Sequence, residues 1–231
     1  MLQTPKNSRH EIKFVANFYT LPKLLVWIKC NELAFYNEYP NREVNNIYFD
    51  TYNYFSYASN LSGESSRQKV RYRWYGNQSL DLGQLEVKNK RNNLGWKDTF
   101  KVMQKPYKIG DSWRQVIQSI SSELPDKAKP ILKLYSFPVI SNKYSRSYFI
   151  SQDKKIRITI DTNQKTYDQR YKSLPNFKVK SNLLDTFVLE VKFDKVERDR
   201  VTDFLTGLPI RVSRHSKYMN SVNSVSGRGY F

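Results

Sequence analysis

The sequence has few of the side chains that build redox sites and zinc sites. Among 231 residues it has one cysteine, Cys30, and two histidines, His10 and His215. A single cysteine excludes an intrachain disulfide and a cysteine-based zinc site. Two histidines cannot by themselves form a histidine-rich metal site.

Long apolar runs and glycine-rich phosphate loops are also missing. No apolar run approaches the roughly 18 residues of a membrane span. The first residues, MLQTPKNSRHEIKF, lack the apolar core of a secretory signal. We therefore expect a soluble protein in a reducing, cytoplasmic setting. Neither G-x-x-x-x-G-K nor G-x-G-x-x-G occurs, so any phosphate must be bound by side chains.

Acidic residues are scarce relative to basic ones. The chain has 21 Asp and Glu against 39 Lys and Arg, a formal net charge of +18. Such an excess causes self-repulsion in the folded state. It points to an anionic partner: nucleic acid, nucleotide, polyphosphate or an anionic membrane surface.

The chain reads as one domain rich in strands. Aromatic residues make up 15% of it, enough to help build a core, and no stretch resembles a linker or a repeat. We expect a single domain over 1–231, with an ordered core at about 9–222 and a flexible tail at 223–231. Strands are predicted at 11–18, 44–51, 68–75, 83–90, 96–103, 143–150, 155–161 and 187–193. Helices are predicted at 22–33, 112–121 (capped by Asp111) and 195–206, with a helix or turn at 52–61 and a long loop at 171–186.

Five of these strands alternate between an apolar face and a charged face. In 69–75, for example, Lys69, Arg71 and Arg73 alternate with apolar or aromatic residues. The charged faces together carry nine bases and four acids: Lys13, Lys69, Arg71, Arg73, Lys88, Lys90, Lys155, Arg157 and Lys192, with Glu11, Glu86, Asp161 and Glu190.

Two architectures fit this alternation. In the simpler one, a sheet has one face on a core and the other in water. In the other, the sheet curls shut around the charged face, and the three helices cover its apolar outside. Nine cations in one lumen would repel strongly, so that lumen would have to be wet and hold a polyanion. Carboxylates inside it could hold Mg²⁺ or Mn²⁺ against that anion.

A series of short motifs follows the order seen in a known family. The motifs are RHEIKF (9–14), NNIYFDT (45–51), KVRYRWYG (69–76), LEVKNKR (85–91), GWKDTF (95–100), YSRSY (144–148), RITIDTN (157–163), VLEVKF (188–193) and RHSKYMNSV (214–222). The chain thereby resembles the VTC domain, the polyphosphate-polymerase module of the triphosphate tunnel metalloenzyme (CYTH-like) superfamily. The resemblance spans residues 9–222.

The resemblance implies an α+β fold: an antiparallel barrel with a charged tunnel that binds nucleoside triphosphate or polyphosphate, covered outside by helices. It also implies a divalent metal, Mn²⁺ or Mg²⁺, held by Glu190. The implied phosphate ligands are Lys13, Arg71, Arg73, Lys88, Arg157 and Lys217 as the catalytic set, with Lys97, Arg146, Arg214 and Ser216 as further substrate ligands. From the charged strand faces we add Lys192 to the substrate ligands, and Glu86 and Glu11 to the metal ligands. The superfamily opens with E-x-E-x-K, of which this chain keeps only Glu11 and Lys13.

Several functions remain open at this point. The resemblance favours a polymerase that passes the γ-phosphoryl group of ATP to a polyphosphate chain and releases ADP. A tripolyphosphatase or nucleoside triphosphatase could use the same tunnel. A non-catalytic polyphosphate-binding domain is a third possibility, and a nucleic-acid-binding module, with cations spread over an outer face, is a fourth. Eukaryotic polymerases of this family have membrane helices, so any membrane partner here would be a separate polypeptide.

Other residues are expected to have structural roles. Lys69, Lys90 and Lys155 lie at predicted strand ends and are expected at the surface. His10 and His215 are expected to be solvated or structural. Two aromatic pairs, Tyr72 with Trp74 and Tyr144 with Tyr148, are expected to pack outward under helices. The segment RHSKYMNSV is expected to form a helix across one tunnel mouth, with Arg214, Ser216 and Lys217 gripping the terminal phosphate.

Overall fold

The fold is built on one antiparallel sheet. The computed structural model describes residues 10–76, 79–92, 94–181, 185–213 and 215–227. Within these ranges nine strands form the sheet, and eight of them follow the order β1-β9-β7-β6-β2-β3-β4-β5, with β8 paired to β7. The strands are β1 (His10–Asn17), β2 (Tyr36–Asp50), β3 (Ser66–Tyr75), β4 (Gly83–Arg91), β5 (Leu94–Val102), β6 (Phe137–Ile150), β7 (Arg157–Asp168), β8 (Lys180–Ser181) and β9 (Thr186–Phe193).

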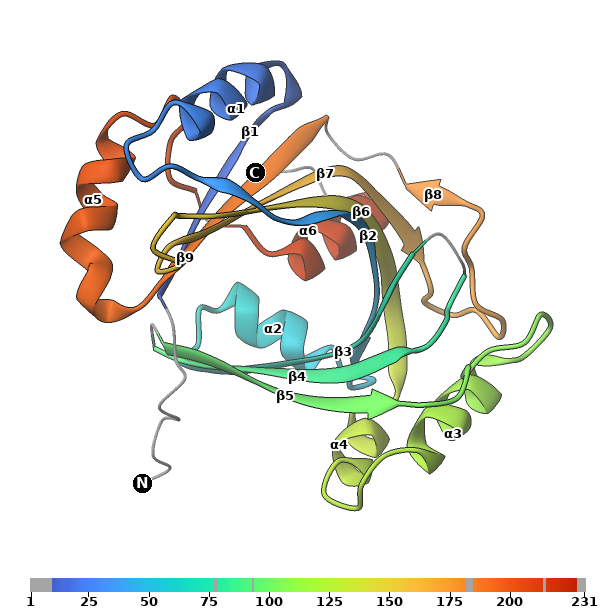
Figure 1. Cartoon of the computed structure of the whole chain (residues 1–231). Helices are drawn as coiled ribbons and strands as arrows, with labels where there is room; N and C mark the ends of the chain where they lie inside the picture. The colour runs from blue at the N-terminus through green and yellow to red at the C-terminus, as the bar shows by residue number, and fades with distance from the viewer. Residues whose placement is uncertain (1–9, 77–78, 93, 182–184, 214, 228–231) are drawn as a thin grey trace.

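The sheet curls around a central space, as Figure 1 shows. Its edge strands β1 and β5 are not paired with each other in the described part of the chain. The free edge of β1 is instead partly covered by residues 212–213. Phe14 forms a bridge with Val212, and the Ser213 amide donates to the Lys13 carbonyl at 2.9 Å. The predicted barrel is therefore confirmed, although strand pairing does not close it.

The three helices that were predicted to cover the outside of the curl do so. The helical segments are α1 (Leu21–Lys29), α2 (Phe55–Leu61), α3 (Trp113–Ser122), α4 (Lys129–Leu134), α5 (Arg198–Thr206) and α6 (Lys217–Val225), with short 3₁₀ turns at Phe18–Thr20 and Lys195–Glu197. One apolar core joins the outer faces of β2 to β5 to α3 and α4, and includes Tyr72 and Trp74. A second joins β1, β7 and β9 to α1 and α5. Each large side chain buried there stabilises the fold by about 1.5–3 kcal/mol.

Helices α2 and α6 lie inside the curl instead (Figure 1). Both are anchored by Asp50, a buried carboxylate at the end of β2. It accepts hydrogen bonds from the amides of Ser56 at 2.8 Å and Tyr57 at 3.1 Å, and from the Tyr218 hydroxyl at 2.6 Å. These bonds hold the start of α6 against the inner face of the sheet.

Several element boundaries differ from the predictions. Ser112, not Asp111, caps α3, because its hydroxyl and the Gln115 side chain form a reciprocal capping box. Helix α4 was not predicted, since six residues are too few to show a helical period. Strand β8 lies in the segment predicted as a loop. Helix α6 continues to Val225, three residues into the expected tail.

Candidate functional site

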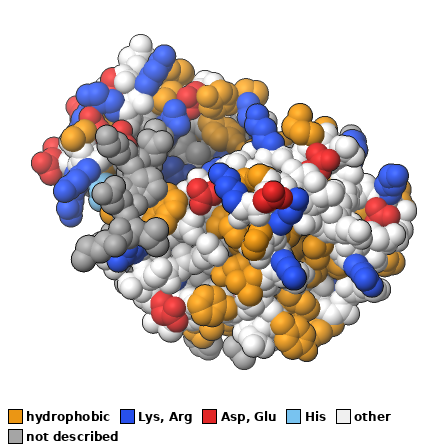
Figure 2. Space-filling view, turned by 90° about the horizontal axis from the view of Figure 1, so that it is seen from below, with side chains coloured by type: hydrophobic (Ala, Val, Ile, Leu, Met, Phe, Trp, Pro, Cys, Tyr) orange, Lys and Arg blue, Asp and Glu red, His pale blue; other side chains and the backbone are white. Residues whose placement is uncertain are grey.

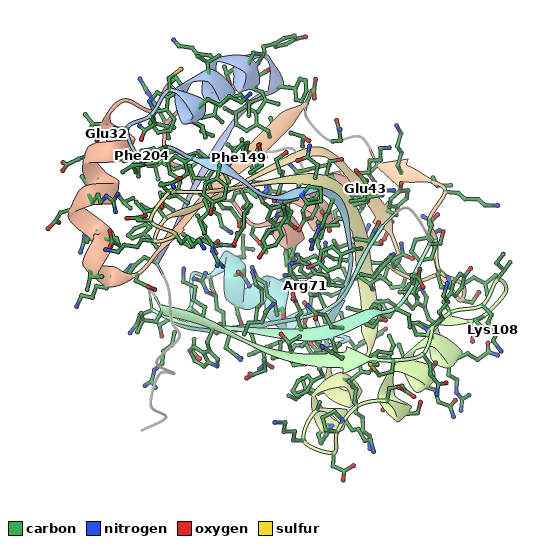
Figure 3. All side chains as sticks on the ribbon, in the orientation of Figure 1. Glu32, Glu43, Arg71, Lys108, Phe149 and Phe204 are labelled. Carbon is green, nitrogen blue, oxygen red and sulfur yellow. The ribbon has the colours of Figure 1, made fainter. Side chains whose placement is uncertain are left out.

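The charged strand faces line the inside of the curl. In Figure 3, Arg71 points into the enclosed space, whereas Phe204 on α5 lies outside it. Nine cationic side chains and four carboxylates converge there among the described residues. They are Lys13, Lys69, Arg71, Arg73, Lys88, Lys97, Arg146, Lys192 and Lys217, with Glu11, Glu86, Asp161 and Glu190. We call this group the lumen cluster.

Glu86 on β4 is the buried counter-ion of the β3 side. Its Oε2 accepts from Arg71 Nε at 2.6 Å, and its Oε1 contacts Lys97 Nζ at 2.6 Å. The carboxyl has no exposed surface. Burial opposes its ionisation, but Arg71, Arg73 and Lys97 outweigh burial and hold the pKa of Glu86 far below its usual value. Both oxygens are thus occupied by cations.

Arg73 lies 3.9 Å from Glu86, and its hydrogen bonds go to neutral groups. Its Nε donates to Asn46 Oδ1 at 2.8 Å, and its Nη2 donates to the Tyr144 hydroxyl at 2.9 Å. Tyr144 therefore faces the lumen, and the prediction that it packs outward is wrong. Tyr148 also has lumen neighbours, because the positive charges of Arg146 and Arg73 act on its phenol. Both tyrosines lie two residues from Arg146 on the same strand, so the two-residue period of β6 gives all three the same face.

Glu190 on β9 lies where four cations meet. Its carboxylate is 3.3 Å from Lys13, 3.1 Å from Lys192, 3.8 Å from Lys217 and 3.9 Å from Arg146. Burial opposes ionisation, yet these four cations keep the pKa of Glu190 well below its usual value. The carboxylate therefore stays charged at any pH near neutral.

Asp161 and Glu11 complete this side of the lumen. Asp161 is fully buried and accepts two bonds from Arg146, at 2.6 and 2.7 Å, and contacts Lys217 Nζ at 2.5 Å. Glu11 is 2.6 Å from Lys13 and 3.9 Å from Lys192. Because Lys13 and Lys192 also contact Glu190, the carboxylates of Glu11 and Glu190 lie close together.

Lys69 and Lys88 have no carboxylate within ion-pair distance in the described chain. Lys69 on β3 lies opposite Lys88 on β4, and Lys88 lies opposite Lys97 on β5. Burial and nearby cations lower the pKa of Lys69 to about 7. The charge of Arg71, together with burial, holds the pKa of Lys88 well below its usual value. Among the described residues, these two lysines are the basic groups of the lumen cluster that have no carboxylate partner.

The surface position predicted for Lys69 is wrong. Its Nζ donates to Ser216 Oγ at 3.0 Å, at the start of α6. The signal was present in the sequence, because Lys69 shares the two-residue period of Arg71 and Arg73. The other two lysines predicted at the surface, Lys90 and Lys155, are indeed exposed.

Three further predicted ligands lie outside the lumen cluster or outside the described residues. Arg157 starts β7 with 46% of its side chain exposed, and its nearest carboxylate, Glu38, is 3.7 Å away. Ser216 caps α6 by accepting from the Met219 amide at 3.3 Å. Helix α6 begins at Lys217. Arg214 itself lies outside the described residues.

The lumen carboxylates differ in how well they could bind a divalent metal ion. No group of three or more His, Cys, Asp or Glu side chains in the described ranges is arranged to hold an ion. Glu190 and Glu11 supply two neighbouring oxygen ligands of the kind that Mg²⁺ and Mn²⁺ prefer. An ion there would need phosphate and water to complete its coordination. Glu86 fits less well, because its carboxyl is fully buried and Arg71 and Lys97 hold its two oxygens at 2.5 and 2.6 Å.

Comparison with known proteins identifies the family and the fold. None of the curated protein sequences matches the chain. A crystal structure from Vibrio parahaemolyticus, whose description names adenylate cyclase, has the same fold with a TM-score of 0.51 at 12% identity, covering 92% of this chain and 97% of that chain. A Hippeastrum protein, named as an adenylyl cyclase with a dominant triphosphatase activity, gives a TM-score of 0.49 at 15% identity, covering 96% of this chain and 97% of that chain. The model of the VTC domain matches residues 8–226. The chain therefore belongs to the VTC domain family and has its triphosphate-tunnel fold.

Proposed function

We propose that the lumen cluster binds the triphosphate of ATP and the end of a polyphosphate chain, and transfers the γ-phosphoryl group from the first to the second. The main support for this proposal is the excess of cations over carboxylates inside the curl, above all Lys69 and Lys88, which have no carboxylate partner among the described residues. A triphosphate carries about four negative charges, which would offset this excess. The binding of that anion would stabilise lysines that are otherwise costly to charge.

Phosphoryl transfer asks a protein mainly to position the phosphates and neutralise charge. Lys69 and Lys88 supply mobile ammonium groups. Arg73 is fixed by Asn46 and Tyr144, so its guanidinium presents its free N–H groups in one orientation. Together these side chains would align the chain of phosphates along β3 and β4.

A divalent ion would be held by Glu190 and Glu11 on the opposite wall. When bound, it would neutralise charge on the transferred group. Glu190 stays ionised for this purpose because its surrounding cations keep its pKa low. Lys13 and Lys192, which contact both carboxylates, would move onto phosphate oxygens as the ion takes their place.

The state of the lumen carboxylates favours phosphate over water as the acceptor. Water has to lose a proton as it attacks, whereas the terminal oxygen of polyphosphate is already ionised. Glu86, Asp161 and Glu190 are poor proton acceptors, because neighbouring cations lower the pKa of each. In the balanced reaction, the acceptor oxygen bonds to the γ-phosphorus, the bond to the β-phosphate oxygen breaks, and ADP leaves.

The outer surface gives less support to a nucleic-acid-binding role. Figure 2 shows the face seen from below, on which Lys and Arg side chains lie scattered among apolar and neutral ones. Binding of single-stranded nucleic acid uses a continuous positive groove with exposed aromatic rings. On this face the basic side chains do not gather in that way.

The test is incubation with ATP and Mn²⁺, with separate measurement of ADP, free phosphate and long-chain polyphosphate. We expect ADP to match the phosphate incorporated into polyphosphate. Free phosphate in place of chain would identify a triphosphatase. Tight binding of tripolyphosphate without turnover would identify a binding module.

The matched control is Glu190→Gln. We expect turnover to fall at least about a hundred-fold while tripolyphosphate still binds, because the substitution removes a metal ligand and a negative charge that competes with phosphate. Wild-type turnover in this variant would rule out Glu190 as the metal ligand.

A further inference from the structure

His215 lies in the lumen beside the start of α6. Residues 212–213, just before it, are bonded to the free edge of β1, and Lys217, two residues after it, enters the lumen cluster. The charged groups that act on its ring are Lys217, Lys13, Glu190 and Asp161, all members of that cluster. His215 is therefore part of the lumen wall.

The hydrogen bond to Asn220 fixes the proton on the far side of the ring. The Asn220 amide nitrogen is 3.0 Å from His215 Nδ1. An amide nitrogen only donates, so Nδ1 accepts, and the proton of the neutral ring sits on Nε2. Burial, reinforced by Lys217 and Lys13, lowers the pKa of His215 to about 3. The ring is thus a neutral group with an Nε2–H donor.

That donor has no partner. Nε2 is buried and makes no hydrogen bond within the described residues. Buried donors in native proteins are nearly always paired, so an unpaired one calls for a ligand. Lys13 and Lys217 act electrostatically on this ring, so the ring lies among cations that would attract a phosphate group.

Ser216 provides a second donor of the same kind. Its Oγ accepts from Lys69 Nζ at 3.0 Å and from the Met219 amide at 3.3 Å. A hydroxyl has two acceptor positions and one proton. With both acceptor positions used, the proton of Ser216 is left to donate into the lumen.

We propose that His215 is a substrate-binding residue whose neutral Nε2–H donates to a phosphate oxygen of the bound triphosphate, next to the Ser216 hydroxyl. The identity of this ligand rests on the proposed function. Ammonium groups attract any polyanion and impose little direction, whereas a fixed N–H sets where one oxygen must lie. The expectation that His215 is only solvated or structural is replaced by this role.

The chain has only two histidines, so nitrogen-15 NMR can observe His215 directly, with His10→Gln used for assignment. We expect the neutral Nε2–H form of His215 throughout the neutral pH range, and a shift of that N–H resonance on saturation with inorganic tripolyphosphate. An ordinary titration near pH 6.5 would overturn the proposal. If calorimetry shows binding but the resonance does not move, only this inference fails. If tripolyphosphate does not bind at all, the proposed function fails with it.

Two substitutions separate hydrogen bonding from packing. His215→Leu removes the donor, and His215→Gln keeps an amide donor. We expect Leu to weaken tripolyphosphate binding at least about ten-fold, and Gln to stay within about three-fold of wild type. His10→Gln is the control, because His10 lies on β1 with its ring stacked on Phe193, outside the lumen cluster. Equal losses for Leu and Gln, with equally lowered thermal midpoints, would show a structural role and overturn the proposal.

Discussion

The two walls of the lumen carry different balances of charge. On the wall formed by β3, β4 and β5, five cations of the lumen cluster face one carboxylate, Glu86; the cations are Lys69, Arg71, Arg73, Lys88 and Lys97. On the wall formed by β1, β9, β7 and β6, with α6, four cations face three carboxylates; these are Lys13, Arg146, Lys192 and Lys217 with Glu11, Asp161 and Glu190. In Figure 1 these walls lie on opposite sides of the central space.

This difference suggests that one wall binds phosphate and the other binds the divalent ion. The β3–β5 wall has the positive excess, so we expect the phosphate chain to lie along it. The opposite wall has the carboxylates that fit a divalent ion. Glu86 and Glu190 illustrate the contrast, because both are buried acids among cations and yet have different roles. Glu86 neutralises Arg71 and Lys97, whereas Glu190 is the carboxylate that we propose as a ligand of the divalent ion.

The largest expected effect on stability is that of Glu86→Gln. The change leaves Arg71 and Lys97 without their buried partner, and breaking a buried ion pair in this way costs about 3–5 kcal/mol in the free energy of unfolding. Glu190→Gln should cost less, because Lys13 keeps Glu11 as a partner and Lys217 keeps Asp161. Denaturant unfolding of both variants measures the difference. Equal losses would show that the two walls do not differ as we propose.

Lys217→Ala is expected to have the next largest effect. Loss of a buried contact to a charged phosphate should weaken triphosphate binding about ten- to a hundred-fold. Lys217 also pairs with the fully buried Asp161, so the thermal midpoint of the ligand-free protein should fall as well. Lys155→Ala is the control, because that side chain is 58% exposed and lies outside the lumen cluster. A Lys217 variant with wild-type binding would show that α6 contributes no ligand to the site.

Lys69 should make triphosphate binding depend on pH. Its pKa of about 7 in the empty lumen rises when a polyanion binds, so binding above pH 7 takes up a proton. Affinity should therefore be highest below pH 7 and fall by up to about ten-fold per pH unit above it.

The stability of the ligand-free protein should change with pH in the opposite direction. Because the pKa is lowered from 10.5, the unfolded state binds more protons, and the contribution of Lys69 to stability rises between pH 7 and 10.5.

Calorimetry in buffers with different heats of ionisation measures this proton uptake. Lys69→Arg keeps the positive charge but does not titrate, so it should bind with similar affinity at pH 6 and lose affinity less steeply at higher pH. Lys69→Met should weaken binding mainly below pH 7. Identical pH profiles for wild type and Lys69→Arg would exclude Lys69 as the titrating group.

The two-residue period of the strands predicted most of this site from sequence. It assigned Lys13, Arg71, Arg73, Lys88 and Glu190 to the charged faces, and the resemblance to the VTC family implied that those faces turn inward. The same period also applied to Lys69, Tyr144 and Tyr148. The predicted positions of those three side chains were nevertheless wrong. For Lys69, its place near a strand end was given more weight than the period, and for the two tyrosines, their aromatic character was.

Other features depend on contacts that a strand pattern does not contain. The pairing of Glu86 with Lys97 joins two strands, and its strength comes from burial that only the folded sheet creates. The orientation of the His215 ring depends on its contact with Asn220, which the motif containing both residues does not reveal. The position of a residue along the tunnel, from its rim to its centre, depends on sheet curvature and on helices α2 and α6. A two-residue period therefore predicts which face of the sheet a side chain lies on, but not how far along the tunnel it lies.

The smallest expected effect is that of Arg157→Gln. This variant tests whether a residue at the rim of the tunnel binds phosphate. The resemblance gives Arg157 and Arg146 the same role as phosphate ligands. The side chain of Arg157 is 46% exposed, with a carboxylate no nearer than 3.7 Å, whereas that of Arg146 is 10% exposed and doubly bonded to Asp161. An exposed charge is screened by water and salt, so Arg157→Gln should change KM by less than about three-fold, and less still at high ionic strength. Arg146→Gln should raise KM much more at either ionic strength and also lower the thermal midpoint. If both variants lose activity equally while Arg157→Gln keeps its wild-type thermal midpoint, the phosphate chain must reach the start of β7, and the substrate-binding part of the tunnel would include its rim.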